Sequence, residues 1–203
     1  MKVAVLQYNA GNVCSVMGAL RRVGVEALLT SSPDEIRSAD RVIFPGQGEA
    51  ATTMRHLRET GLDRIIAGLT QPVLGICIGQ QLLCAHSEEG NTDCLNLFPE
   101  IPVKKFVAKK EFAMKVPHMG WNTLEQAKTS LFQSVKDDSY VYFVHSYYVP
   151  VCPWTIAETQ YGDVRFSAAM RRGNFFATQF HPEKSGAVGL SILRAFCESE
   201  GTV

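Results

Sequence analysis

Short apolar runs alternate with helix-like segments through roughly the first ninety residues, and this alternation limits the chain to few folds. The runs KVAVLQ, VEALLT, RVIF and VLGI have the length and composition of buried strands. Helical segments separate them at residues 13–23, after Pro33, and at about 49–69. Strands that alternate with helices predict an α/β fold with an open, doubly wound and mostly parallel sheet. We expect Asn12 to cap the first helix and Gly24 to end it.

The second half of the chain has strand composition, with turn signals and little helix. Its strand-like segments are VKKFV, YVYFVHSYYV, WTIAET, RFSAAM and FFATQF. We expect them to add an antiparallel region to the first sheet. A closing helix over about 187–199 places Val188, Ile192 and Phe196 on one face. Because we find no internal repeat, low-complexity tract or linker, we predict a single domain over residues 1–203.

The composition argues against several classes of function. Twenty basic residues balance twenty acidic ones, so neither nucleic-acid binding nor membrane-surface binding has electrostatic support. MKVAVLQYN lacks the apolar core of a signal peptide, and no run is long enough to span a bilayer. The six cysteines are scattered and contain no Cys-x-x-Cys pair, which argues against a zinc site or a redox pair. We therefore expect a cytoplasmic protein without a metal or cofactor.

The stretch PVLGICIGQQLL, residues 72–83, carries a cysteine where a strand ends and a helix begins. Gly75 and Gly79 flank Cys77, and such glycines relieve crowding at a strained strand–nucleophile–helix turn. The turn lifts the side chain out at the carboxyl end of the sheet, where ligands bind. The N–H groups of the following helix favour the thiolate, and that of Ile78 can bind an oxyanion. The alternative is that Cys77 is a small buried hydrophobic residue.

A thiol nucleophile needs a base, and the base needs a group that orients it. His181 is the histidine best placed for this, because it lies in ATQFHPEKS just after an apolar strand. In an extended segment Glu183 projects to the same side as His181 and can hold one ring nitrogen. The other nitrogen is then free to face the thiol. His-Pro-Glu alone fits a solvated strand end equally well, and the turn at Cys77 favours the catalytic interpretation.

The loop IFPGQGEA follows the third predicted strand and precedes a helix. It contains two glycines but no Lys-Ser/Thr, so it does not match a phosphate-binding loop. In open α/β enzymes with a nucleophile on such a turn, this loop usually supplies the second oxyanion donor. We expect the backbone N–H of Gln47, or of a neighbouring glycine, to fill that role. A plain turn before a helix is the alternative.

The Gly-x-Cys-x-Gly-x-Gln pattern around Cys77 and the His-x-Glu pattern at His181 together resemble the class I, triad-type glutamine amidotransferases. PGQGEAATTM, PHMGWN, YFVHSYY and FHPEKSG narrow the resemblance to the glutaminase subunits of imidazole glycerol phosphate synthases. These segments occur in order and at family-like spacing along nearly the whole chain. The triad fixes only the superfamily, whereas PHMGWN and YFVHSY discriminate within it.

The resemblance implies a specific reaction. Cys77 attacks the side-chain amide of L-glutamine, assisted by His181, which Glu183 orients and which then protonates the departing ammonia. Water activated by His181 hydrolyses the γ-glutamyl thioester to glutamate. The resemblance also implies a heterodimer with a (β/α)₈-barrel cyclase subunit, whose core passes the ammonia. The cyclase makes imidazole glycerol phosphate and aminoimidazole carboxamide ribonucleotide in histidine biosynthesis.

The resemblance also implies binding roles for residues outside the triad. Four residues are expected to contact glutamine: Gly48, Gln81, Ser146 and Tyr147. Tyr147 could instead be an aromatic core residue. Lys184 resembles a family position that faces the partner subunit, with a solvated lysine as the alternative. Trp121 in PHMGWN is either an interface contact or a core residue. Gln47 stands where the family often has a small apolar residue, which leaves the mechanism intact because the backbone does the work.

Three other functions fit parts of the pattern. A glutaminase subunit serving chorismate, guanylate or pyridoxal phosphate synthesis would share the triad but should lack PHMGWN and YFVHSY. A non-catalytic α/β interaction module would tolerate loss of the nucleophile, the base or the carboxylate, yet all three are present. A free-standing thiol hydrolase would be highly active without a partner.

Overall fold

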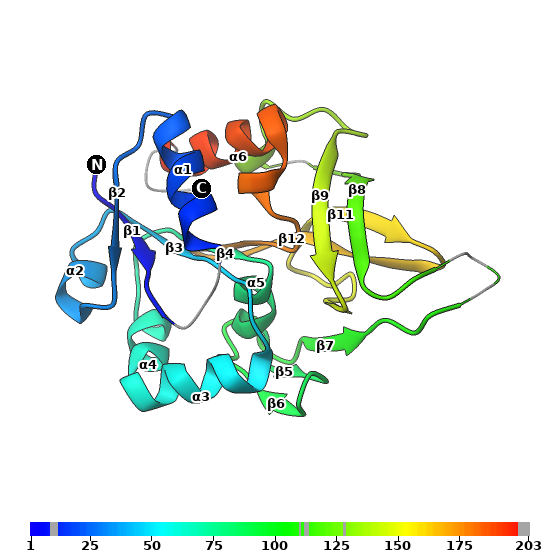
Figure 1. Cartoon of the computed structure of the whole chain (residues 1–203), viewed down its shortest axis with the longest axis horizontal. Helices are drawn as coiled ribbons and strands as arrows, with labels where there is room; N and C mark the ends of the chain where they lie inside the picture. Colours follow the sequence, from blue (N-terminus) through cyan, green and yellow to red (C-terminus); the bar gives the residue numbers. More distant parts are fainter. Residues whose placement is uncertain (9–11, 110, 112–113, 128, 199–203) are drawn as a thin grey trace.

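A seven-stranded mixed sheet runs through the middle of the molecule (Figure 1). The computed structural model describes residues 1–8, 12–109, 111, 114–127 and 129–198. Five neighbouring strands are parallel, and they lie in the order β2 (Ala27–Thr30), β1 (Val3–Leu6), β3 (Arg41–Phe44), β4 (Val73–Ile76) and β13 (Phe175–Thr178). Two antiparallel strands, β12 (Val164–Arg172) and β11 (Thr155–Tyr161), extend the sheet beyond β13. This order confirms the predicted open, mostly parallel sheet with an antiparallel addition.

Helices cover both faces of the sheet (Figure 1). On one face lie α1 (Val13–Arg22) and α6 (Gly186–Glu198). On the other lie α2 (Pro33–Arg37), α3 (Ala50–Thr60), α4 (Leu62–Ala67) and α5 (Ile78–Leu83). Successive strand residues alternate between the two cores, so Val3 and Val5 pack with α1 while Ala4 and Leu6 pack with α3. No helix within the described ranges is long and apolar enough to cross a membrane.

Some predicted helix features differ from the structure. The single helix expected over 49–69 is two helices, because the backbone at Gly61 has a φ of 73° and turns the chain between α3 and α4. The side chain of Asn12 makes no capping hydrogen bond to α1 and instead donates to the Glu183 carboxylate. The closing helix is described as far as Glu198; Ser199, where its end is predicted, lies outside the described residues.

Two smaller sheets hold strand-like segments that we expected in the main sheet. One is four-stranded, in the order β10 (Tyr147–Tyr148), β7 (Pro102–Lys105), β5 (His86–Ser87) and β6 (Thr92–Asp93). The other pairs β8 (His118–Thr123) with β9 (Tyr140–His145) in antiparallel register. Strand β8, which contains most of PHMGWN, was not predicted from the sequence. Two bonds attach β9 beside the His181 segment: the Tyr142 carbonyl accepts from the His181 N–H, and the Tyr142 N–H donates to Ser185.

Candidate active site

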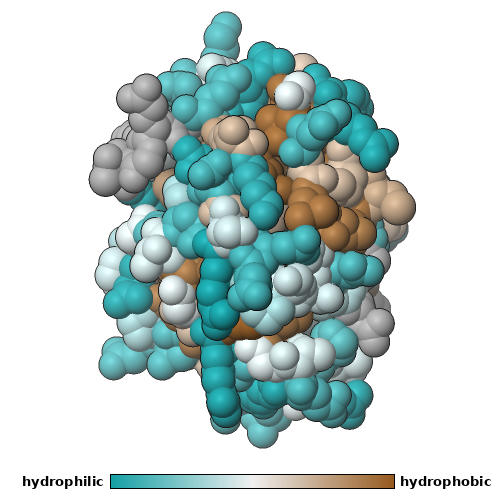
Figure 2. Space-filling model, turned by 90° about the vertical axis from the view of Figure 1, so that its left-hand side faces the viewer, coloured by the Kyte–Doolittle hydropathy of each residue, from teal (hydrophilic) through white to brown (hydrophobic). Residues whose placement is uncertain are grey.

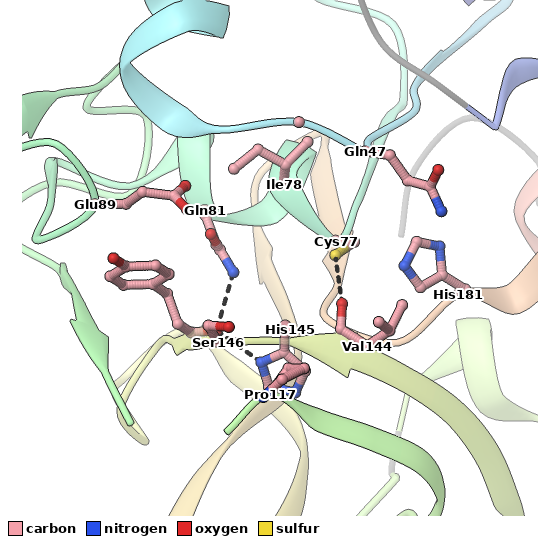
Figure 3. A pocket seen from close by; sticks show the side chains of 12 residues that line it. Gln47, Cys77, Ile78, Gln81, Glu89, Pro117, Val144, His145, Ser146 and His181 are labelled. Carbon is pink, nitrogen blue, oxygen red and sulfur yellow. Dashed lines mark hydrogen bonds between the residues drawn. The ribbon is translucent and has the colours of Figure 1, made fainter. Parts of the chain in front are cut away.

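A pocket of about 310 Å³ lies where β3, β4 and β13 end (Figure 3). Its wall includes the loop after β3, the turn after β4, the segment after β13, and the β9–β10 connection. The lining residues are Gln47, Gly48, Cys77, Ile78, Gln81, Glu89, Pro117, Val144, His145, Ser146, Tyr147 and His181. Cys77 and His181 therefore share the pocket with every residue expected to bind an oxyanion or glutamine.

Cys77 occupies a strained turn between β4 and α5. Its φ of 53° and ψ of −103° are unfavourable for a residue with a side chain, at a cost of about 1–3 kcal/mol. The Cys77 N–H donates to the Thr178 carbonyl at 2.7 Å, which ties the turn to β13. A side chain at Gly79 would place its Cβ 2.4 Å from the Phe44 carbonyl oxygen, and one at Gly75 would contact the Gly79 backbone at 2.9 Å. The glycines thus permit close approach of chain segments, as the predicted turn requires.

The Cys77 sulfur is largely buried and lies on the pocket wall (Figure 3). It is 3.8 Å from the Val144 carbonyl oxygen and 3.6 Å from the side-chain nitrogen of Gln179. The other five thiols lie outside the pocket. Burial raises the pKa of three of them: that of Cys84 well above its usual value, that of Cys94 to about 12 and that of Cys197 to about 11. Those three thiols stay protonated and unreactive at neutral pH.

His181 and Glu183 meet in the buried interior. Nδ1 of His181 lies 2.7 Å from Oε1 of Glu183, and Asn12 donates to the same oxygen. The predicted extended conformation is wrong: residues Pro182–Lys184 form a single 3₁₀ turn, which brings the two side chains together. Among the described residues, Nε2 of His181 and Oε2 of Glu183 have no hydrogen-bond partner. Because Nδ1 is bonded to the carboxylate, Nε2 is the ring nitrogen available to groups in the pocket, which His181 lines beside Cys77 (Figure 3).

The charge of His181 depends on its two neighbours. Burial alone lowers the pKa of this imidazole, but the Cys77 sulfur and the hydrogen-bonded Glu183 carboxylate outweigh burial and raise the pKa to about 10. His181 therefore holds its proton through neutral pH when it faces a thiolate. An imidazolium beside a thiolate is a base–nucleophile pair with its proton already transferred.

The loop after β3 is anchored beside the nucleophile. The Tyr8 hydroxyl donates to the Pro45 carbonyl, and burial raises the pKa of Tyr8 far above its ordinary value, so this hydroxyl stays a donor. Gln47 and Gly48 follow directly and line the pocket. Ile78 is the first residue of α5, where a backbone N–H has no partner within the helix. The oxyanion roles of the Gln47 and Ile78 N–H groups stay predictions.

Gln81 projects from α5, and both hydrogens of its side-chain amide are donated to hydrogen bonds within the protein. Its Nε2 donates to the Tyr147 carbonyl at 3.0 Å (Figure 3) and also to Oε1 of Gln179 at 3.1 Å. A primary amide has two donors, so both are used within the protein. The remaining polar atom is Oε1, an acceptor suited to an N–H group of a ligand. Ser146 and Tyr147 continue this wall of the pocket.

Glu89 is a half-buried carboxylate on the pocket wall that was not predicted from the sequence. One of its oxygens accepts from the Ala50 N–H at 2.8 Å. Burial raises the pKa of Glu89, partly offset by that hydrogen bond. Glu89 follows Glu88 in a polar turn, and nothing in the local sequence distinguishes a pocket carboxylate from a solvated one. His145 and Gln179 were also missed; the only signal for His145 was its place in YFVHSY.

The residues predicted to face a partner lie outside the pocket. Trp121 on β8 is 56% exposed, which excludes the core alternative, and Met119 on the same strand is 66% exposed. The Trp121 ring packs edge-on against Tyr142, and the Lys184 ammonium lies 6.0 Å from the centre of the Tyr142 ring. Exposed aromatic and apolar side chains grouped in this way are typical of interaction surfaces. By contrast, the face at the β2 end of the sheet is largely hydrophilic, with smaller apolar areas (Figure 2).

Comparisons with known proteins agree with this geometry. Residues 5–199 match the family model for Glutamine amidotransferase class-I. "Imidazole glycerol phosphate synthase subunit HisH" of Bacteroides thetaiotaomicron is 58% identical over 198 residues, which are 98% of this chain and 100% of the relative. The protein of that name from Escherichia coli (strain K12) is 45% identical over 200 residues, with the same coverage. A solved crystal structure of a glutamine amidotransferase has a TM-score of 0.72 at 21% identity, covering 97% of this chain and 97% of that one; this likeness shows the fold alone.

The raised pKa of His181 keeps a positive charge beside the Cys77 sulfur at neutral pH, and such a charge makes a cysteine more reactive. In His181→Gln, the rate at which iodoacetamide alkylates Cys77 at pH 6.5 should fall about tenfold, because that charge is lost. Peptide mass spectrometry measures the rate, and His86→Gln is the control because His86 pairs with Asp93 outside the pocket. An unchanged alkylation rate in His181→Gln would contradict the interaction of His181 with Cys77.

Proposed function

The chain belongs to the class I glutamine amidotransferases, and we infer from that membership that it releases ammonia from glutamine for a synthase. More narrowly, it is the glutaminase subunit of imidazole glycerol phosphate synthase, an enzyme of histidine biosynthesis. Identities of 45–58% extend over 98% of the chain, and PHMGWN and YFVHSY lie within the matched length. We propose that residues 1–203 form a single amidotransferase domain.

The observation that carries the mechanism is that Cys77 and His181 line one pocket, with the Glu183 carboxylate bonded to His181. In the proposed first step, the Cys77 thiolate attacks the side-chain carbonyl carbon of glutamine. The oxygen becomes an oxyanion, which the N–H groups of Ile78 and Gln47 would stabilise. His181, held by Glu183 through Nδ1, gives its Nε2 proton to the amide nitrogen. The carbon–nitrogen bond then breaks, leaving a γ-glutamyl thioester and free ammonia.

The second half of the reaction regenerates the thiolate. His181, now neutral, accepts a proton from a water molecule, and the resulting hydroxide attacks the thioester carbonyl. The carbon–sulfur bond breaks and glutamate leaves. Cys77 returns to a thiolate with His181 protonated, which is the ion pair with which the cycle began. The raised pKa of His181 supports this resting state.

The pocket wall opposite His181 supports L-glutamine as the substrate (Figure 3). The Glu89 carboxylate carries the charge that pairs with an α-ammonium group, and Oε1 of Gln81 can accept one of its hydrogens. Gly48, Ser146 and Tyr147 complete the binding wall. Recognition of the amino-acid end leaves the amide directed toward the sulfur.

The relatives' names describe a subunit, so the chain has a cyclase partner subunit. We propose that this partner is a (β/α)₈ barrel forming a heterodimer with the chain. Trp121, Met119, Tyr142 and Lys184 would form the docking surface, beside the strand that reaches the pocket. Docking there would let ammonia pass from the pocket to the cyclase without protonation in bulk water. The six unpaired cysteines fit our proposal of a cytoplasmic location.

Removal of the thiol tests the proposed function directly. Cys77→Ala should lower glutamine-dependent glutamate release by at least about 10³-fold, because no other group can form the thioester. The complex of this variant with the cyclase subunit should still make product from added ammonium. The assay measures glutamate and product for the chain alone, with the cyclase subunit, and with the subunit and its ligand. Cys14→Ala is the control, since Cys14 is an exposed thiol. Glutamine-dependent release that survives in Cys77→Ala would overturn the assignment, and full activity without the cyclase would indicate a free-standing hydrolase.

The proposed contact between Glu89 and the α-ammonium group should affect the KM for glutamine and not kcat. Glu89→Gln should raise the KM for glutamine about tenfold, since a charged hydrogen bond to the α-ammonium is lost, and should leave kcat within about twofold. Steady-state kinetics of the complex measure both constants. Glu88→Gln is the matched control, because the neighbouring Glu88 carboxylate accepts from the Lys105 N–H and does not line the pocket. Equal KM values in the two variants would exclude the proposed contact.

The docking surface makes a separate prediction about affinity. Trp121→Ala should weaken binding of the cyclase subunit by about 10- to 100-fold, because exposed tryptophans often dominate interface energies. Glutaminase activity should recover when the cyclase subunit is saturating. Leu28→Ala provides the control, since Leu28 is a partly exposed apolar residue of the edge strand β2. Binding is measured by titration calorimetry, and equal affinities for both variants would place the interface elsewhere.

A further inference from the structure

We propose that Gln179 is a further catalytic residue, whose side-chain amide donates a hydrogen bond to the Cys77 sulfur and stabilises the thiolate. Gln179 directly follows β13 and is fully buried. Its Nε2 lies 3.6 Å from Sγ of Cys77, within the range of a hydrogen bond to sulfur. The proposal rests on the proposed function only in taking Cys77 as the nucleophile.

The direction of this hydrogen bond follows from its neighbours. The Tyr147 carbonyl can only accept, so the atom of Gln81 that lies 3.0 Å from it must be the amide nitrogen. The same nitrogen lies 3.1 Å from the Gln179 side chain and offers it the second hydrogen. The Gln179 atom that receives this hydrogen must be the oxygen, Oε1. Its nitrogen is thereby directed at the sulfur of Cys77.

A pair of neutral histidines extends this chain of bonds away from the pocket. Nδ1 of His145 donates to the Tyr147 carbonyl at 2.6 Å, and Nε2 of His145 lies 3.0 Å from Nδ1 of His118. With Nδ1 of His145 protonated, its Nε2 accepts from His118. Burial lowers the pKa of His118 to about 4 and that of His145 to about 3, with the His118 charge contributing to the latter. Both rings therefore stay neutral at physiological pH, as this pattern of donors requires.

The network connects the two motifs that discriminate the family to the nucleophile. His118 belongs to PHMGWN and His145 to YFVHSY. Through the Tyr147 carbonyl and Gln81, both fix the orientation of the Gln179 amide. Gln81, Gln179, His118 and His145 are buried and Tyr147 is half-buried, and a reversed Gln179 amide would place its N–H group against the Gln81 donor. The donor is thus already oriented before substrate binds.

The chemical effect follows from the two forms of sulfur. A thiolate is a strong acceptor, whereas a thiol accepts weakly and donates its own hydrogen. The Val144 carbonyl, 3.8 Å from Sγ, can only accept and so favours the thiol. The Gln179 amide acts in the opposite sense, because it favours the charged form. Gln179 therefore supplements the His181 charge and offsets the Val144 carbonyl.

The test is the pH dependence of Cys77 alkylation by iodoacetamide in the full-length chain. In Gln179→Met, the midpoint of the rate profile should move up by about one pH unit, so that alkylation below the midpoint slows about three- to fourfold, because the greater nucleophilicity of the less stabilised thiolate offsets part of the loss. Gln80→Met is the matched control. Gln80 is also a fully buried glutamine, but its amide donates to the Ser167 carbonyl and not to the sulfur. Its profile should match that of the unmodified chain.

Gln179→Met loses the hydrogen bond from Gln81, and this loss can impair folding. Gln179→Glu is a second variant that keeps this bond. A glutamate retains an oxygen to accept from Gln81, but it has no amide donor for the sulfur. Since a carboxyl ionises before a thiol and then opposes a second negative charge, the midpoint should move further upward than in Gln179→Met. Circular dichroism establishes that each variant is folded at the temperature of alkylation.

A profile in folded Gln179→Glu that overlaps that of the unmodified chain would overturn the proposal. A merely structural role predicts lower melting temperatures in Gln179→Met and Gln80→Met alike, without a shift of the alkylation midpoint in either. Alkylation requires no glutamine, so its outcome is independent of the glutaminase assignment. That assignment is judged by glutamate release from Cys77→Ala.

Discussion

The strained backbone at Cys77 is the constraint on which the rest of the site depends. A φ of 53° at a residue with a side chain persists only when the surroundings hold it there. Here a hydrogen bond from its N–H to Thr178 and close approach of the chain at Gly79 do so. The turn belongs to β4, which lies between β3 and β13. Those two neighbours therefore deliver Gln47 and His181 to the same edge of the sheet, where ligands bind in open parallel sheets.

Three buried histidines near the pocket differ in charge for one physical reason. Burial disfavours the charged form of each, and it lowers the pKa values of His118 and His145 to about 4 and about 3. At His181 a sulfur and a carboxylate overcome the same penalty and raise the pKa to about 10. One ring therefore carries a proton, which the proposed mechanism uses for ammonia release, while the other two stay neutral and keep the hydrogen-bond pattern behind Gln81 fixed. All three rings are buried, and the different groups beside them leave one ring charged and two rings neutral.

The proposed docking surface and the pocket share a strand. The side of β9 that carries Tyr142 meets Lys184 and Trp121, while the residues at its end, Val144 and His145, line the pocket. The backbone of Tyr142 bonds to the His181 segment in both directions, through the His181 N–H and through Ser185. Tyr142 thus contacts the proposed docking surface through its ring and the His181 segment through its backbone. This proximity fits a subunit whose ammonia is used by another chain.

The amino-acid sequence alone determined the α/β fold class, the turn at Cys77 and the His181–Glu183 pairing, because each depends on residues close together along the chain. The local geometry expected from the sequence was wrong at two places where residues distant in the chain are in contact. His-Pro-Glu is a 3₁₀ turn, and the Asn12 side chain donates to Glu183 instead of capping its helix. Only the tertiary structure decided that Glu89 lines the pocket, that Trp121 is exposed, and that Gln179 faces a sulfur 102 residues away. These features depend on strand order and on chains of buried hydrogen bonds. Local propensity contains no information about which distant groups a fold brings into contact.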